Sequence, residues 1–170
     1  SGSFKILSIS GMLSILTGIT EVSAVLLLGL LIDAALNSSV DNPLGNNVFL
    51  FSAGLMFFLL IRPIIFGCSS YMQSVIVTPN IFNLVLSRIH RWCIGHSIPF
   101  FENDFAGRIA QKEMQTARAV TDVVVEILQT VLFALASLIG AAIMLLSVNI
   151  TLAIALIIWL VFYIFLIGYF

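Results

Sequence analysis

Histidine and cysteine recur at a spacing that could hold a metal ion in the run His90-x-x-Cys93-x-x-His96. Both residue types are common ligands of zinc. On a helix, however, steps of three residues spread the three side chains over about a third of the circumference. A structural zinc site also needs a fourth ligand, which this stretch lacks. We therefore expect no metal site here.

Two charged residues lie inside long apolar stretches, where a charge is costly. Glu21 is the first charge in the apolar run from Ile6 to Leu36, and Arg62 interrupts the run from Val48 to Val77. Ionisable residues at such depth usually face protein or water and are functional candidates by default. Two compatible interpretations follow. The residues line a substrate path, or they form an ion pair between two helices that fixes their packing.

A stripe of polar residues is predicted on one face of a later helix. Arg118, Asp122, Glu126 and Thr130 are spaced four residues apart, with Gln129 beside them. Residues at this spacing share a helix face. Asp122, Glu126 and Gln129 are therefore candidates for an aqueous substrate path. The alternative is that Asp122 and Glu126 are simply the solvated end of a membrane helix.

The chain has no motif for hydrolysing a nucleotide. No glycine is followed by lysine, so the phosphate-binding loop Gly-x-x-x-x-Gly-Lys-Ser/Thr does not occur. No Ser/His/Asp or Cys/His arrangement for nucleophilic catalysis is supported either. We expect no catalytic residue, no bound cofactor and no metal in this chain, so that any ATPase must lie in other sequence.

The composition is typical of a membrane protein. Of the 170 residues, 61% are apolar and only 9% are charged, and the mean hydropathy is +1.17. A soluble domain carries about 25% charged residues, so most of this chain must have lipid as its solvent. A net charge of -1 without a basic stripe argues against a nucleic-acid partner. Cys68 and Cys93 lie too far apart on one predicted helix to form a disulfide.

Four apolar stretches predict an all-α membrane protein. We expect helix one at about 6–36, helix two at about 48–98, helix three at about 106–147, and helix four from about 150 and truncated. A turn-rich loop at 37–47 and a short turn at 148–149 join them. Pro63 and Pro79 are expected to kink helix two. Residues 1–3 are interpreted as a cloning scar.

Helices two and three are too long for a bilayer alone. At about 1.5 Å per residue they measure about 75 Å and about 63 Å, whereas a hydrocarbon core is about 30 Å thick. They must project together about 25–30 Å beyond it. The positive-inside rule predicts that this end, residues 78–118, is cytoplasmic. Six of the seven basic residues lie on that side: Lys5, Arg88, Arg91, Arg108, Lys112 and Arg118.

The segment between these two helices carries a family resemblance. The pattern Pro99-x-Phe101-Glu102-x-x-x-Ala106-Gly107-x-Ile109, after a long amphipathic helix with His96, resembles the first intracellular loop of ABC exporters of the multidrug and lipid-flippase type. The resemblance covers the whole chain in helix order and length, while the specific motif covers about residues 96–122. Phe105, Arg108 and Thr116 depart from the family pattern, which affects individual salt bridges and not the fold.

The resemblance implies that residues 97–107 are a coupling loop, which in that family touches the nucleotide-binding domains. Its aromatic residues would fill a groove, and its polar residues would form the rim. Asn103 or Asp104 would cap helix three, and Gly107 would let the turn close tightly. A simpler interpretation is that the aromatic residues pack the hairpin tip or touch headgroups. The residues concerned are Pro99, Phe100, Phe101, Glu102, Asn103, Asp104, Phe105 and Gly107.

As the resemblance implies, residues 4–170 would be part of an exporter's transmembrane domain in a bacterial inner membrane. They would form the substrate path and follow the motion of a nucleotide-binding domain, on the same or another chain, that holds ATP and Mg²⁺. The other expected partners are the lipid bilayer, a second transporter half or copy, and an amphipathic or lipid-like substrate. Two other classes stay open: a four-helix channel or secondary transporter, and a non-transporting membrane scaffold.

Overall fold

The computed structural model describes residues 2–37, 48–95 and 106–169. The first helix is α1 (Gly2–Leu36), and the last is α8 (Ile150–Tyr169). Between them, one continuous helix contains α2 (Val48–Met56), α3 (Arg62–Tyr71) and α4 (Thr78–Ile94), and another contains α6 (Ala106–Glu126) and α7 (Leu132–Val148). The described residues form no strand, and their four long helices are apolar enough to cross a membrane. The prediction of an all-α membrane protein is confirmed.

One helix end differs from the expected one, and another lies outside the described residues. The first helix begins at Gly2, so it includes residues that we had set aside as a scar. The second is described as far as Ile94, and its predicted end near residue 98 lies outside the described residues. Between α7 and α8 a single extended residue, Asn149, makes the turn. Its Oδ1 accepts the Thr151 N–H at 2.8 Å, as expected of an N-cap.

Each proline of the second helix follows a π-helical segment. η2 (Phe57–Ile61) precedes Pro63, and η3 (Met72–Val77) precedes Pro79. Proline has no N–H to donate, and its ring clashes with the carbonyl four residues back. The backbone hydrogen bonds therefore change to the π-helical pattern just before each proline. The Arg62 N–H donates to the Phe57 carbonyl and the Thr78 N–H to the Gln73 carbonyl, each five residues back. A π-helical segment thus precedes each proline, and the kinks expected at Pro63 and Pro79 stay a prediction.

α1 packs against α7 through small residues. A Cβ added to Gly18 would lie 2.8 Å from the Cβ of Ala136 and 2.8 Å from the carbonyl oxygen of Phe133. Further along, a Cβ on Gly140 of α7 would lie 3.0 Å from a methyl group of Val22. Because lipid tails are as apolar as side chains, membrane helices associate through such close contacts. This seam holds the two helices together.

Ser10, Ser14, Thr17 and Thr20 of α1 are buried, and three of their hydroxyl groups donate hydrogen bonds within the helix. Ser14 donates to the Ser10 carbonyl at 3.1 Å, Thr17 to the Ser14 carbonyl at 2.6 Å, and Thr20 to the Leu16 carbonyl at 2.7 Å. An unsatisfied polar group in hydrocarbon would cost several kcal/mol. Hence serine and threonine act here as small packing residues.

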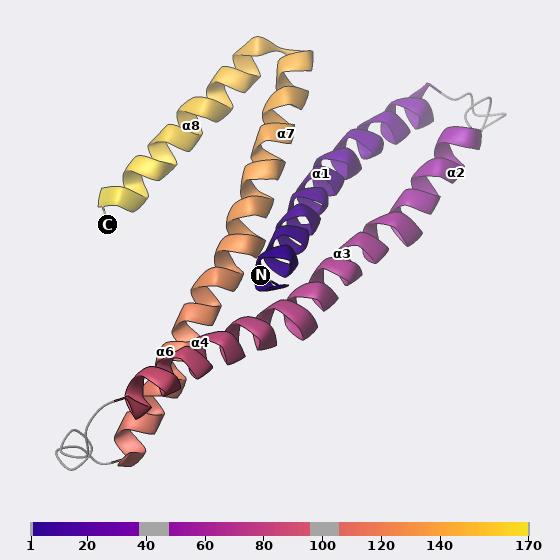
Figure 1. The fold of residues 1–170 in the computed structure, drawn as a ribbon. Coiled ribbons are helices and arrows are strands. Elements are labelled where there is room, and N and C mark those ends of the chain that lie inside the picture. The colour runs from indigo at the N-terminus through magenta and orange to yellow at the C-terminus, as the bar shows by residue number, and fades with distance from the viewer. Residues whose placement is uncertain (1, 38–47, 96–105, 170) are drawn as a thin grey trace.

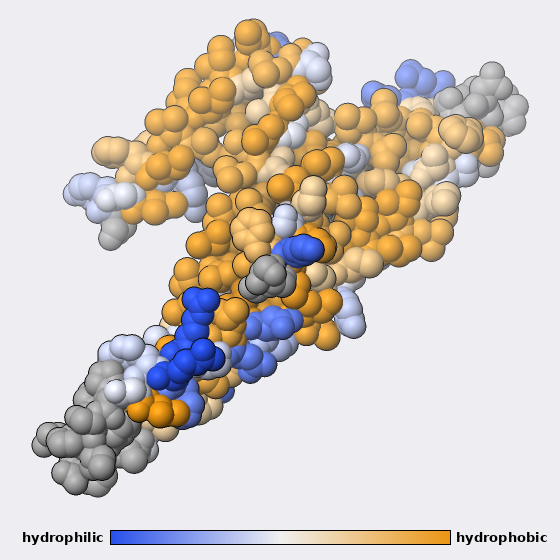
Figure 2. All heavy atoms as spheres, viewed as in Figure 1, coloured by the Kyte–Doolittle hydropathy of each residue, from blue (hydrophilic) through white to orange (hydrophobic). Residues whose placement is uncertain are grey.

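α1, α7 and the α2–α3 part of the second helix form a bundle from which the α4–α6 hairpin extends, while α8 lies apart, beside α7 (Figure 1). α1 lies between α7 and the α2–α3 part of the second helix, and α4 pairs with α6 beyond the N-terminus of α1. Val77, Ile81, Ala117 and Thr121 are buried between the paired segments. In the view of Figure 2, hydrophilic residues gather on this hairpin, while most of the remaining visible surface is apolar. The bundle thus offers lipid an apolar exterior, and its polar end lies at the α4–α6 hairpin.

Candidate functional site

The two charges predicted to lie inside the membrane helices form an ion pair. One Nη of Arg62 donates to both carboxylate oxygens of Glu21, at 2.9 and 3.0 Å. Arg62 opens α3 directly after η2, and Glu21 lies near the middle of α1. About a third of each side chain is exposed, 37% for Arg62 and 38% for Glu21. The ion-pair interpretation describes the observed geometry, and a partly open pair is also compatible with lining a path.

Counting residues along α1 and along the second helix places the ion pair near the middle of the bilayer. At 1.5 Å per residue, Glu21 is about 22 Å from Leu36, and Arg62 is about 21 Å from Val48. A bilayer with its headgroups is about 40–45 Å thick. Two independent counts from the 37–47 side therefore give the same depth. A lone charge would be costly at this level, so each residue supplies the counter-charge that the other needs.

A polar groove adjoins the ion pair on the side of the α4–α6 hairpin. The guanidinium carbon of Arg62 lies 5.9 Å from the ring centre of Phe66, and that ring is part of the groove wall. The groove has a volume of about 450 Å³ and combines hydroxyl and amide groups with two aromatic rings. Its lining residues come from α1, α3, η4 (Ile127–Val131) and α7: Thr17, Phe66, Ser69, Ser70, Gln129, Thr130 and Phe133.

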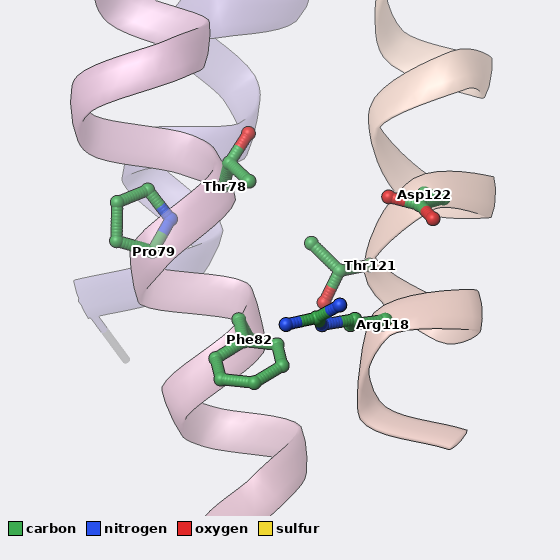
Figure 3. Close-up of a pocket in the computed structure, with 6 residues that line it drawn as sticks. All are labelled: Thr78, Pro79, Phe82, Arg118, Thr121 and Asp122. Atoms are coloured by element: carbon green, nitrogen blue, oxygen red, sulfur yellow. The ribbon is translucent and has the colours of Figure 1, made fainter. Parts of the chain in front are cut away.

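The predicted polar stripe is divided between two grooves. Gln129 faces the groove beside Phe66, whereas Asp122 lines a second groove between α4 and α6, together with Arg118 (Figure 3). Glu126 lies between them and is exposed. The five candidate path residues therefore do not form one site. Glu21, Arg62 and Gln129 lie around one region, and Asp122 belongs to another.

One buried polar residue was missed by the sequence reasoning. Gln73 in η3 is almost fully buried, and its Nε2 donates to the Val125 carbonyl of α6 at 3.5 Å. The available signal was that Gln73 is the single amide residue in the mostly apolar run from Val48 to Val77. Its contact joins the second and third helices where the hairpin leaves the bundle.

A cluster of titratable groups joins α4 to α6 near the hairpin end. Oε2 of Glu113 lies 3.3 Å from Nδ1 of His90. The same carboxylate hydrogen-bonds Cys93, and this bond together with burial raises the pKa of the thiol. No set of three potential ligands that could hold a metal ion occurs in the described part of the chain, and His96 lies outside it. Cys68 and Cys93 are both free thiols, as expected.

Most of the predicted coupling loop lies outside the described residues, including everything from Pro99 to Phe105 and both candidate caps, Asn103 and Asp104. Gly107 is described, and it lies inside α6. Among the described residues, a Cβ at this position would meet no atom within 4 Å. The turn itself lies outside the described residues, so its closure at Gly107 stays a prediction.

Comparison with known proteins gives one distant similarity. Over 106 residues the chain is 27% identical to a Haemophilus influenzae protein described as an uncharacterized ABC transporter ATP-binding protein. The match covers 62% of this chain but 17% of that relative's length. No family model matches the chain, and no solved structure does. With four helices able to cross a membrane, the similarity indicates a transport-related membrane protein.

Proposed function

We propose that this chain is the membrane-spanning part of an ATP-driven exporter of the ABC type. The observation that carries the proposal is the length of two paired helices, Val48–Ile94 and Gly107–Val148, with 47 and 42 residues. They correspond to about 70 Å and 63 Å, against about 30 Å of hydrocarbon. A channel or simple scaffold has no need of an α4–α6 hairpin held that far from the lipid.

The hairpin would couple this chain to an ATP-hydrolysing domain that lies outside the given sequence. In the proposal, residues 97–107 lie in the cytoplasm and contact a nucleotide-binding domain, which holds ATP and Mg²⁺. That domain belongs to the same protein or to a partner, and a second transporter half or copy completes the path. The Haemophilus influenzae relative is described as an ATP-binding protein, which supports such an arrangement. A continuous helix can carry a displacement from its tip into the membrane.

The substrate path would run past the ion pair of Glu21 and Arg62 and the groove beside it. The groove presents hydroxyl groups, the Gln129 amide and the rings of Phe66 and Phe133. Such a mixture suits a molecule with both polar and apolar parts. We therefore propose an amphipathic or lipid-like substrate, and assign no catalytic residue to this chain.

Deleting Phe100–Asp104 from the whole protein tests this function. An exporter without its coupling contact should still bind ATP but should lose substrate-stimulated ATP turnover and export. A matched deletion of five residues in the other loop, Val40–Leu44, serves as the control and should retain both activities. Substrate flux that is independent of ATP in the intact protein would identify a channel or secondary transporter. Absence of any flux, with partner binding retained, would identify a scaffold.

A further inference from the structure

A second groove lies between α4 and α6 and carries one charge of each sign. It has a volume of about 440 Å³. Phe82 and Pro79 form its α4 side, and Arg118 and Asp122 belong to its α6 side, one helical turn apart (Figure 3). Thr78 and Thr121 complete the lining. An apolar wall thus faces a cation and an anion across one cavity.

The two charges of this groove are not neutralised by each other. Within the described part of the chain, neither Arg118 nor Asp122 takes part in an ion pair, and both are exposed. Residues four apart on a helix can pair, but here the Arg118 guanidinium extends toward Phe82 on the opposite helix. The neighbouring threonine hydroxyls already donate to backbone carbonyls, Thr78 to Gln73 and Thr121 to Ala117. The cation and the anion are therefore the free recognition groups.

The groove lies at the level of the lipid headgroups. Arg118 is about 45 Å from Val148 along the third helix, and Thr78 is about 45 Å from Val48 along the second. Both distances equal the thickness of a bilayer including its headgroups, about 40–45 Å. Asp122 is one turn closer to the hydrocarbon, at about 39 Å. A ligand reaching this groove from the membrane would enter headgroup first, with its chains along the apolar wall.

We propose that this groove binds the headgroup of a zwitterionic phospholipid, with the phosphate on Arg118 and the ammonium on Asp122. Guanidinium groups bind phosphate oxygens through paired hydrogen bonds, and a carboxylate is the natural acceptor for a primary ammonium. Phe82 and Pro79 contact the first carbons of the acyl chains. The bound lipid anchors the hairpin at the point where it leaves the bilayer. This assignment does not rest on the proposed export function, because it requires no transport and no ATP.

Native mass spectrometry of the detergent-purified protein tests the site. The probes are phosphatidylethanolamine and phosphatidylglycerol with the same acyl chains. Phosphatidylethanolamine should bind more tightly to the unmodified protein. Arg118→Gln should weaken both lipids by about fivefold, the change expected of one interfacial charge. Asp122→Asn should weaken phosphatidylethanolamine alone and thus abolish the preference.

Control variants and a soluble competitor make the outcome decisive. Arg88→Gln removes a similarly exposed cation on α4 outside the groove and should leave both affinities unchanged. Equal binding of the two lipids by the unmodified protein, or a preference that survives Asp122→Asn, would overturn the proposal. So would an Arg118→Gln variant that binds as the unmodified protein does. Soluble phosphoethanolamine that competes as well as the lipid would show that the occupant is not a membrane lipid.

Discussion

The guanidinium of Arg62 bridges to both carboxylate oxygens of Glu21 from the neighbouring helix, at 2.9 and 3.0 Å. The two residues are 41 positions apart in the chain, yet each lies about 21–22 Å from the end of its helix on the 37–47 side. The pairing therefore fixes the register of α1 against α3. It also makes the two charges interdependent, because removing one leaves the other alone at mid-membrane depth.

Neutralising one member of the pair should destabilise the protein more than neutralising both. Glu21→Gln or Arg62→Gln alone should cost about 2–3 kcal/mol, the cost of a lone charge at the centre of a membrane helix. The double variant should recover most of that loss. Thermal unfolding in detergent, run as a double-mutant cycle, measures the coupling. Additive losses would show that the two charges do not stabilise each other in the folded protein.

Transport kinetics test whether the same ion pair also lines the substrate path. If Glu21 and Arg62 line the route of the substrate, the folded double variant should show a changed KM for transport, since the groove beside Phe66 loses its charged border. Transport kinetics identical to those of the unmodified protein would limit the pair to a packing role. The thermal measurement and the transport measurement are independent, so one role can fail without the other.

Gly18 should tolerate no side chain, whereas Gly29 on the same helix should tolerate one. In Gly18→Ala the new methyl group would lie 2.8 Å from the Phe133 carbonyl oxygen, a backbone atom that cannot move aside cheaply. Overpacking of this kind costs about 1–3 kcal/mol. In Gly29→Ala the methyl group would meet no atom of the described residues within 4 Å, and the change should be neutral or slightly stabilising because alanine is the better helix former. Gly18→Ala should therefore unfold at a lower temperature than Gly29→Ala. Equal unfolding temperatures would mean that α1 and α7 are packed less closely than in this structure.

Local features of the sequence were sufficient to predict the helices, and they identified the two charged residues without deciding between an ion pair and a substrate path. Hydropathy and turn residues mark each membrane helix, because the requirement to bury an apolar length in lipid acts on consecutive residues. Among the described residues, proline likewise follows two of the three π-helical segments, since it removes a hydrogen bond at a known position. η4 contains no proline, and no residue within it predicts a π-helical segment.

Long-range packing was not visible in the sequence. The close contact of Gly18 with Ala136 joins residues more than a hundred positions apart. Nothing in either segment alone identifies its partner. The division of the polar stripe was missed for the same reason. Asp122 and Gln129 lie on one side of a helix, but Asp122 faces α4, whereas Gln129 faces α1 and α3.

Cys93 should react slowly with maleimides until Glu113 is removed. The hydrogen bond that the thiol donates to the Glu113 carboxylate, burial and the negative charge of that carboxylate raise the pKa of the thiol, so less of the reactive thiolate is present near pH 8. Glu113→Ala, in a Cys68→Ala background, should shift the pH–rate curve to lower pH and speed the reaction several-fold. His90→Ala is the matched control because it keeps the carboxylate. A faster reaction without a shift along the pH axis would indicate exposure of Cys93 and not a changed pKa.

Single introduced cysteines should report opposite sides of the membrane for the two loops. The basic residues gather on the α4–α6 side, which the positive-inside rule places in the cytoplasm. In a background with Cys68 and Cys93 replaced by alanine, Ser39→Cys should react with an impermeant maleimide in intact cells. Ser97→Cys should react only after the cells are opened. Labelling is read by a gel shift, and the permeant reagent confirms that both cysteines are reactive. Labelling of Ser97→Cys in intact cells would place the hairpin outside, where no ATP-driven domain could reach it, and the exporter proposal would be withdrawn.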